Sequence, residues 1–337
     1  MGFEFAVVKG KTVHSVIHRS LQECVDVVEA AYLTHHAGAT VNPDSYFLRF
    51  PDNPSARIIA LPAYLGGRFD VSGLKWIASY PQNITKGFPR ASAVLVLNRP
   101  DTGYPYALLE ASIISAARTA ASACLAARFL DGGRKRAPSV GVVGSGLIAR
   151  YLLTFLQGTG WELGKVRLYD ASPEEAARLA RRLSEGTPRL EAEACADLEE
   201  LVTQSELLAF ATTAPTPYLM DPALFAHAPR VLHISLRDLA PEILLASNNV
   251  VDDVEHVMKA DTSPHLAEKR VGHRQFVNGS LAELITGKFV LDRRRATIFS
   301  PFGMGILDLA VGSWVHQQAL ASGEAVRFDD FFFDLVR

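Results

Sequence analysis

The sequence predicts an α/β protein with a doubly wound parallel sheet in the middle of the chain and an α+β domain built from its two ends. Strand and helix patterns alternate from about residue 138 to residue 302, and a glycine-rich turn follows the first of those strands. The flanking segments mix short strands with long apolar helices. Such alternation is typical of a parallel sheet with helices on both faces. We expect residues 1–130 and 303–337 to form one domain, and 131–302 the other.

The first part of the chain, up to about Ala127, predicts a mixture of helices and strands. Ser20–Thr34 has the apolar spacing of an amphipathic helix, and Ala111–Leu130 is an alanine-rich helix. Clusters of Gly, Pro, Asn and Asp separate the strands expected between these helices. The expected strands are Arg57–Tyr64, Gly73–Ser79 and Ser92–Asn98.

The middle part predicts the parallel sheet. A buried strand at Ser139–Val143 leads to a helix at Leu147–Gln157. Ser172 is followed by Pro-Glu-Glu, a capping-box pattern with proline at the first helical position, and predicts a helix to about Leu183. The other expected strands are Lys165–Tyr169, Glu206–Thr212, Arg230–Ile234 and Asn249–Asp252.

The last part begins near Phe302, and its helical spacing runs over Gly305–Leu320. The tail Phe328–Val336 is so apolar and aromatic that we expect it to return to the first domain or to a partner subunit. Together with the N-terminal strands it predicts a homodimer.

Composition excludes several functional classes. A formal net charge of −2 offers no basic field for nucleic acid. Three cysteines without a CxxC pair argue against a disulfide framework and indicate a reducing compartment. His35, His36 and His256 lack metal-ligand spacing, and Arg118 interrupts the longest weakly charged stretch, Ala111–Ala127. We therefore expect a cytoplasmic protein without a signal peptide, metal site or membrane partner, which binds a small molecule.

The motif Gly144-x-Gly146-x-x-Ala149 directly follows a predicted strand and begins a helix. Gly144 permits the tight turn, Gly146 lets the backbone approach a pyrophosphate, and Ala149 allows close helix–strand packing. Asp170 ends the next strand, where a ribose-binding acid is expected, and would disfavour a 2′-phosphate. A lone motif of this kind often marks only a turn, but the ordered set favours NAD. Contacts are expected from Gly144, Ser145, Gly146, Leu147, Ile148 and Asp170.

Two basic residues occupy unusual settings, since Lys75 lies inside an uncharged strand and Arg118 inside an uncharged helix. Burial of a cation costs several kcal/mol unless an anion pairs with it. The alternative interpretation of Lys75 is that it lies on the solvent-exposed face of its strand. Arg118 has two alternatives, a side chain that extends to solvent or a structural ion pair with an acidic residue.

Five ordered segments resemble the ornithine cyclodeaminase/μ-crystallin family. They are 79–83, 115–121, 144–146, 211–213 and 306–310. The resemblance implies a Rossmann domain inserted into a substrate-binding and dimerisation domain. It also implies that Arg49, Lys75 and Arg118 bind the substrate α-carboxylate, and guanidinium and ammonium groups suit that role.

The same resemblance implies a catalytic Asp after the fifth Rossmann strand, where Asp238 stands in the segment 232–242. We expect Lys75 to act as a catalytic residue together with Asp238. The alternative for Asp238 is a cap on a helix that begins near Pro241. Further cofactor contacts are expected from Thr212, Thr213, Ser235, Phe302 and Gly303.

Three segments, 86–93, 236–239 and 300–303, resemble a subgroup that forms 2,3-diaminopropionate in siderophore and peptide-antibiotic pathways. The resemblance implies NAD-dependent oxidation of N-(1-amino-1-carboxy-2-ethyl)-glutamate and hydrolysis of the imine. Arg90 and Arg237 suit a substrate with three carboxylates, although a surface salt bridge is an alternative for Arg90. Ornithine cyclodeamination, an alanine dehydrogenase or ketimine reductase activity, and a non-catalytic binding role remain alternatives.

Overall fold

The computed structural model describes residues 4–186 and 189–333, and the chain divides into two compact units. The first unit contains Met1–Arg118 and Met304–Arg337, and the second contains Thr119–Gly303. The first division falls inside helix α3 (Ser112–Leu130), earlier than the expected boundary after residue 130.

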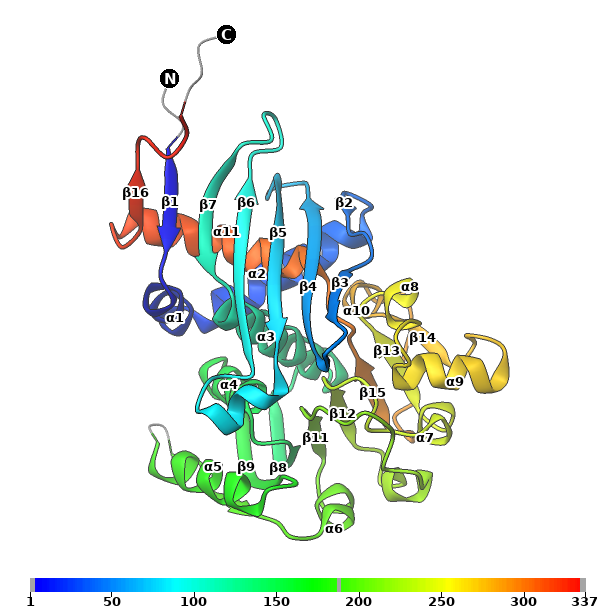
Figure 1. Cartoon of the computed structure of the whole chain (residues 1–337). Coiled ribbons are helices and arrows are strands. Elements are labelled where there is room, and N and C mark those ends of the chain that lie inside the picture. Colours follow the sequence, from blue (N-terminus) through cyan, green and yellow to red (C-terminus); the bar gives the residue numbers. More distant parts are fainter. Residues whose placement is uncertain (1–3, 187–188, 334–337) are drawn as a thin grey trace. The chain divides into compact units, whose positions relative to one another are not determined.

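The first unit contains one mixed sheet with the strand order β16-β1-β7-β6-β5-β4-β2, and β3 pairs with β4 (Figure 1). All described pairings in it are antiparallel except that of β1 with β7. Its strands are β1 (Phe5–Val8), β2 (Thr40–Val41), β3 (Tyr46–Phe50), β4 (Asn53–Leu65), β5 (Val71–Ser79), β6 (Ala91–Asn98), β7 (Pro105–Glu110) and β16 (Val326–Phe328). Its helices are α1 (Gly10–Arg19), α2 (Leu21–His36), η1 (Pro81–Lys86), the start of α3 and α11 (Gly305–Ala321).

One face of this sheet packs against α11, which contacts β4, β5, β6 and β7. Gly73 is required there, because a Cβ would lie 2.8 Å from Leu309 and 2.2 Å from the Val96 carbonyl oxygen. Lys75 projects from the same face, since it lies two residues beyond Gly73 on β5. The opposite face exposes Trp76 and Val94, which pair across β5 and β6.

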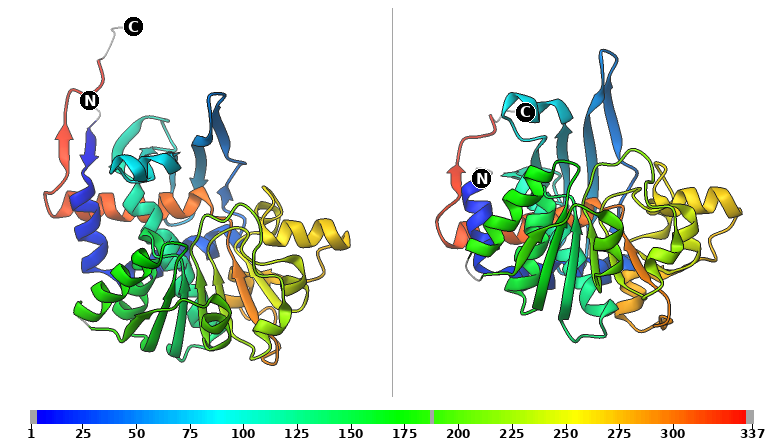
Figure 2. Two further views of the ribbon diagram at one scale, coloured as in Figure 1. Left: turned by 60° about the horizontal axis from the view of Figure 1, so that its bottom comes forward. Right: turned by 90° about the horizontal axis from the view of Figure 1, so that it is seen from below.

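The C-terminal tail returns to its own unit, as one of the two expectations had it. Strand β16 pairs with β1, so segments from the two ends of the chain lie side by side (Figures 1 and 2). The Phe331 ring stacks on Phe5, with 3.9 Å between the ring centroids. The end of the predicted tail, residues 334–336, lies outside the described residues.

The second unit contains a parallel sheet with the order β10-β9-β8-β11-β12-β15-β13-β14, as the alternating pattern predicted. Its strands are β8 (Arg136–Val143), β9 (Glu162–Tyr169), β10 (Ala192–Ala194), β11 (Leu207–Phe210), β12 (Arg230–His233), β13 (Asn248–Val251), β14 (Val277–Ser280) and β15 (Thr297–Ser300). Its helices are α4 (Leu147–Gly158), α5 (Pro173–Glu185), α6 (Leu198–Thr203), η2 (Pro222–Phe225), α7 (Pro241–Leu245), α8 (Val254–Val257), α9 (Ser263–Val271) and α10 (Leu281–Ile285).

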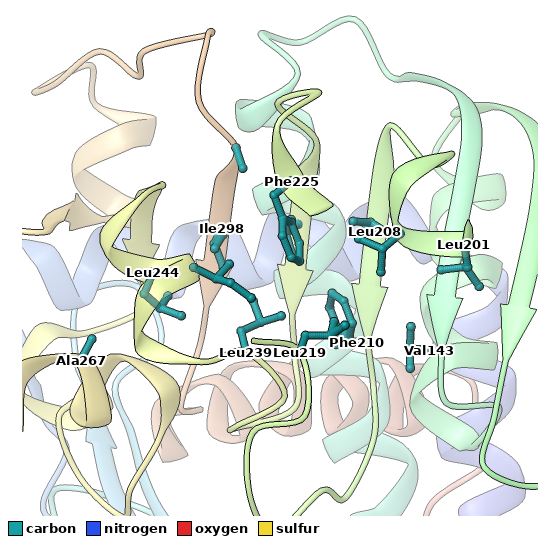
Figure 3. Packing of buried hydrophobic residues seen from close by; sticks show 14 residues of the cluster. Val143, Leu201, Leu208, Phe210, Leu219, Phe225, Leu239, Leu244, Ala267 and Ile298 are labelled. Carbon is teal, nitrogen blue, oxygen red and sulfur yellow. The ribbon is translucent and has the colours of Figure 1, made fainter. Parts of the chain in front are cut away.

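A hydrophobic core joins the central strands of this sheet to α6, α7 and η2 (Figure 3). Phe210 of β11 and Ile298 of β15 are fully buried, and Leu244 of α7 and Leu201 of α6 pack in the same cluster. Burial of each such side chain contributes roughly 1.5–3 kcal/mol. The core thereby places the carboxyl ends of β8, β11, β12 and β15 along one edge.

The start of helix α5 differs in one detail from the sequence prediction. Helix α5 begins after Ser172 as predicted, but the Ser172 side chain makes no cap hydrogen bond, so the predicted capping box is wrong. A capping box forms instead at Ser280 and Glu283, at the start of α10.

By length and composition α3 could cross a membrane, but 61% of its apolar window is buried, as in a core helix of a soluble protein.

Candidate active site

The glycine turn after β8 needs both of its glycines, one for its backbone conformation and one for the open space beside it. Gly144 has a φ of 96°, and a Cβ there would lie 2.6 Å from the Ala211 carbonyl oxygen. Gly146 is the N-cap of α4, where no side chain caps the helix, and a Cβ on it would meet no protein atom within 4 Å. The first N–H groups of α4 are therefore open to an anion.

Asp170 lies directly after β9 and is held beside this turn. Its Oδ2 accepts a hydrogen bond from the Ser145 backbone N–H at 2.7 Å, and its Oδ1 accepts from the Ser172 N–H at 3.0 Å. Each carboxylate oxygen has two acceptor positions, so both oxygens keep capacity for a ribose hydroxyl.

Two serines expected to bind the cofactor carry unsatisfied hydroxyl groups. Ser145 Oγ and Ser235 Oγ are buried and reach no hydrogen-bond partner among the described residues. A buried polar atom without a partner costs about 1–3 kcal/mol. The unpaired hydroxyls, the uncapped helix and the open space at Gly146 all fit a bound dinucleotide.

The remaining predicted cofactor residues have different surroundings. Thr213 and Leu147 are exposed, and Ile148 is half-buried. The backbone N–H groups of Phe302 and Gly303 donate to Asp252, at 3.0 and 2.6 Å. Burial raises the pKa of Asp252, although these N–H bonds oppose the effect. Sequence reasoning did not single out Asp252, which follows β13 and positions the 302–303 turn.

Asp238 lies in a buried polar cluster at the carboxyl ends of β11 and β12. Its Oδ1 accepts hydrogen bonds from Thr212 Oγ1 at 2.5 Å and from the Tyr218 hydroxyl at 2.8 Å. Its Oδ2 lies 3.2 Å from His233 Nε2, and His233 Nδ1 lies 3.2 Å from Ser300 Oγ. The helix-cap alternative is excluded, because α7 has Ala240 at its N-cap and no side-chain cap bond.

The electrostatics of this cluster keep Asp238 ionised. Burial favours the neutral acid, but the hydrogen bond and charge of His233 and the bond from Thr212 outweigh it, so the pKa of Asp238 falls to about 2. Burial and the neighbouring Asp238 raise the pKa of Tyr218, which therefore keeps its proton. Asp238 is fully buried, whereas 38% of Tyr218 is exposed, so Tyr218 is the solvent-facing member of this pair.

His233, Tyr218 and Ser300 were not singled out from the sequence. His233 carried the clearest signal, since it is a titratable residue at the end of a buried strand, five positions before Asp238. Tyr218 lies in an irregular loop, and its hydroxyl reaches Asp238 only through the fold.

A second charged cluster lies within the first unit. Lys75 Nζ lies 2.6 Å from Asp308 Oδ2, and Arg118 Nε lies 3.3 Å from Asp308 Oδ1. Lys75 is 2% exposed, so its exposed-face alternative is wrong. Arg118 does form the ion pair that was considered as an alternative, but the two cations share one carboxylate and the cluster keeps a net charge of +1.

Asp308 lies in one of the segments that resemble the family, 306–310, but its role was not predicted from the sequence. It lies in the first turn of α11, surrounded by apolar residues, and is fully buried. A lone acid in such a helix requires a cation, and that signal was present in the sequence. Burial lowers the pKa of Lys75 to about 8, against the opposing effect of Asp308 and with the help of Arg118.

The other predicted substrate residues make no recorded contact with Asp308 and have neighbours of their own. Arg49 is exposed on β3, with its guanidinium 5.3 Å from the centroid of the Phe47 ring. Arg90 donates from Nη1 to Ser79 Oγ at 2.8 Å. Arg237 donates from Nη2 to the Ala260 carbonyl at 2.7 Å, and its buried Nε has no partner among the described residues. The described residues contain no group of three or more potential metal ligands.

Comparison with known proteins places this site in a family. The family model described as "Ornithine cyclodeaminase/mu-crystallin family" matches residues 7–323. An N-((2S)-2-amino-2-carboxyethyl)-L-glutamate dehydrogenase from Staphylococcus aureus is 31% identical over 306 residues, 88% of this chain and 90% of the relative.

Two solved structures share the fold over almost the whole chain. The Δ(1)-pyrroline-2-carboxylate reductase of Thermococcus litoralis, in complex with NADH and L-proline, has a TM-score of 0.88 at 25% identity and covers 96% of this chain and 99% of its own. An archaeal alanine dehydrogenase dimer with bound NAD has a TM-score of 0.84 at 26% identity and covers 98% and 100%. These likenesses confirm the predicted fold class, and the chain belongs to the ornithine cyclodeaminase/μ-crystallin family.

Proposed function

We propose that this chain oxidises N-(1-amino-1-carboxy-2-ethyl)-L-glutamate with NAD and hydrolyses the product to 2-oxoglutarate and L-2,3-diaminopropionate. It is an NAD-dependent oxidoreductase of amino-acid CH–NH bonds, as its relatives and structural neighbours are. The finer assignment is supported by the surplus positive charge of one cluster in the first unit, where Lys75 and Arg118 share the Asp308 carboxylate. Arg90 of the same unit donates to the neutral Ser79 hydroxyl. A substrate with three carboxylates suits that surplus.

Lys75 and Arg118 hold the α-carboxylate of the glutamate part. Asp308 fixes both cations and leaves their cluster one positive charge, which the substrate neutralises. NAD held at the glycine turn and by Asp170 would supply the hydride acceptor for the glutamate Cα, and the amine nitrogen would release its proton to solvent. The substrate is left with a carbon–nitrogen double bond. The protein contributes to this step by holding the substrate in a reactive orientation, while the redox chemistry belongs to the cofactor.

Hydrolysis of that imine requires a water molecule placed against its carbon. The Tyr218 hydroxyl accepts a hydrogen bond from this water and donates to Asp238 Oδ1, so a proton can pass from water through Tyr218 to Asp238. The water oxygen bonds to the carbon, and the proton held by Asp238 passes to the nitrogen, which gives a carbinolamine. The remaining hydroxyl proton then moves to the nitrogen as the carbonyl forms and the carbon–nitrogen bond breaks. The products are the keto acid and the diamine.

The reaction class separates this proposal from its alternatives. A family member of the alanine dehydrogenase type yields NADH from simple amino acids, and a cyclodeaminase yields no net NADH. We expect N-(1-amino-1-carboxy-2-ethyl)-L-glutamate to produce NADH and 2-oxoglutarate in equal amounts. Absorbance of NADH over a panel with alanine, ornithine, glutamate and N-substituted glutamates tests this, and preference for alanine would reassign the enzyme.

Cofactor choice is expected to depend on Asp170. NAD binds more tightly than NADP, because a 2′-phosphate would meet the carboxylate held by Ser145 and Ser172. In Asp170→Ala the preference shrinks as the repulsion disappears. Quenching of protein fluorescence by each nucleotide measures both affinities, and a wild-type preference for NADP would refute the assignment.

The rate is expected to fall in alkaline solution as Lys75 loses its proton, because the charged ammonium binds the carboxylate. Burial lowers the pKa of Lys75 to about 8. The pH dependence of kcat/KM reports the pKa values of groups in the free enzyme, so the decline should follow this group. Asp308→Asn removes a charge that raises this pKa, so the decline should begin at lower pH. The substrate amine titrates identically with both enzymes, and superimposable profiles would contradict the role of Lys75.

We also propose a cytoplasmic homodimer formed through the exposed sheet face of the first unit. Tyr46, Trp76 and Val94 lie in one row across β3, β4, β5 and β6 and are 69%, 41% and 38% exposed. Contiguous apolar surface of this kind marks an interface.

Trp76→Glu is expected to shift the dimer to monomer, because a buried charge opposes association. Val290→Glu, at a residue that is 91% exposed in the second unit, is the matched control and should stay dimeric. Sedimentation at micromolar concentration measures both variants. A wild-type chain that sediments as a stable monomer would refute the dimer.

A further inference from the structure

His233 and Ser300 lie beside each other at the carboxyl ends of two neighbouring parallel strands. β12 pairs with β15 through Leu232 and Phe299, and His233 and Ser300 directly follow these two residues. His233 also pairs with Phe210 of β11, whose ring meets the imidazole at 87° with 6.2 Å between the centroids. His233 and Ser300 are both buried, so the sheet and the Phe210 ring hold the imidazole in one orientation.

The two ring nitrogens of His233 face different partners. Nδ1 lies 3.2 Å from Ser300 Oγ, and Nε2 lies 3.2 Å from both Asp238 Oδ2 and the Asp238 backbone nitrogen. A neutral imidazole Nε2 can donate to the carboxylate or accept from the N–H, but it cannot do both. The ionised carboxylate is the stronger partner, because charge-assisted hydrogen bonds are about twice as strong as neutral ones. The Ser300 hydroxyl can donate to Nδ1, which leaves the imidazole proton on Nε2.

This arrangement gives the two oxygens of Asp238 different surroundings. Oδ2 is occupied by His233, whereas Oδ1 accepts from Thr212 and from Tyr218, the solvent-facing member of the cluster. Two titratable side chains face Asp238, His233 from β12 and Tyr218 from the loop after β11, and Tyr218 keeps its proton. Burial raises the pKa of Asp238, and His233 makes the largest contribution that lowers it. The charge of the buried carboxylate therefore depends mainly on the imidazole.

We infer that His233, held by Ser300, is a positioning residue for the hydrolysis step. It keeps Asp238 ionised and directs Oδ1 toward Tyr218, so that the carboxylate can receive a proton from water. This rests on the proposed function, in which Tyr218 and Asp238 carry that proton. His233 touches no substrate in this role and acts through Asp238, so its loss should slow hydrolysis and spare hydride transfer.

His233→Leu removes the hydrogen-bond donor and keeps the position apolar. We expect the pKa of Asp238 to rise, because the effect of burial is then less opposed. A base must be ionised to act, so keto-acid release should fall by about 10-fold for each unit of pH below the raised pKa. Single-turnover measurements of NADH and 2-oxoglutarate between about pH 5 and 8 test this. The ratio of variant to wild type at each pH cancels the titration of the substrate.

Conservative variants separate this role from a merely structural one. His233→Gln keeps an amide N–H donor and cannot titrate, so hydrolysis should return to within about 10-fold of wild type without an acid decline. Ser300→Ala removes the partner of Nδ1 and should slow hydrolysis by about 2- to 10-fold, the range of one neutral hydrogen bond, whereas Ser300→Thr should not. Ser247→Ala, at a buried serine that donates to the Ile243 carbonyl, is the matched control and should change neither step.

If His233→Leu does not fold, the comparison of Ser300→Ala with Ser300→Thr decides, and equal rates of hydrolysis in these two variants would overturn the inference. Equal slowing of hydride transfer and hydrolysis in folded His233→Leu and His233→Gln would also overturn it, since the role of His233 would then be structural.

Infrared spectra of the substrate-free enzyme test the charge of Asp238 without turnover. The protonated carboxyl should be absent from wild type near neutral pH and should appear in His233→Leu as the pH falls, and spectra of the same enzymes with Asp238→Asn identify its band. Protonated Asp238 in wild type, or an unshifted Asp238 in folded His233→Leu, would overturn the inference. If the NADH screen refutes the proposed substrate and the infrared shift is found, the proposed function fails and the control of Asp238 by His233 stands.

Discussion

Asp238→Asn is expected to lower the rate of keto-acid release by about 10²–10⁴-fold, the usual contribution of a general acid–base group. The asparagine oxygen can still accept from Thr212 and Tyr218, and its amide can donate to a neutral His233. The fold, NAD affinity and substrate affinity should therefore persist. Single-turnover experiments should show NADH before 2-oxoglutarate, with an imine between them.

Tyr218→Phe provides the matched test of how the proton reaches Asp238. It removes the hydroxyl that connects Asp238 to solvent and leaves the carboxylate with Thr212 and His233. We expect it to slow hydrolysis and spare hydride transfer. If both signals slow equally in Asp238→Asn, the carboxylate serves amine deprotonation. If neither slows, Asp238 only anchors the loop that contains Tyr218.

Arg118→Ala is expected to reduce kcat/KM by between about 30-fold and several thousand-fold, since losing a charged contact costs about 2–5 kcal/mol. Without Arg118 the ion pair of Lys75 and Asp308 is neutral, and no net charge remains to attract the carboxylate. NAD affinity should be unchanged, because Arg118 is assigned to the substrate.

Arg118→Lys distinguishes binding from folding. It keeps the positive charge but loses the guanidinium geometry, so it should recover part of the activity. Unfolding of both variants at the temperature of the assay, measured by circular dichroism, would show that Arg118 serves the ion pair with Asp308. A folded Arg118→Ala enzyme with normal kcat/KM would remove Arg118 from the substrate site.

The long elements could be predicted because their residues carry regular patterns. Helices α2 and α11 and strands β4, β5 and β6 appear where the apolar spacing indicated. Strands β1 and β16 were not predicted, because a segment of three or four residues has no readable period and becomes a strand only when it pairs. The capping box at Ser172 failed because the pattern permits the bond without requiring it.

The site shows the same difference between local and distant information. Gly144, Gly146 and Asp170 follow strands at a recognisable spacing, so the sequence indicates their arrangement. Asp308, the partner that Lys75 and Arg118 share, lies 233 and 190 residues from them in the chain. Its isolation in an apolar helix indicates that it needs a cation, but not which one. The hydroxyl of Tyr218 reaches Asp238 only because a loop folds back over the end of β12.

The discontinuity of the first unit has a consequence for synthesis of the protein on the ribosome. Lys75 and its counter-ion Asp308 are 233 residues apart, with the whole second unit between them. A nascent chain must therefore carry β5 with an unpaired cation until α11 has emerged, whereas the second unit is continuous and complete before then. Domains generally fold as units during synthesis. We therefore expect the sheet of the first unit to be completed last, so that newly made chains acquire the parallel sheet before the ion pair of Lys75 and Asp308 forms.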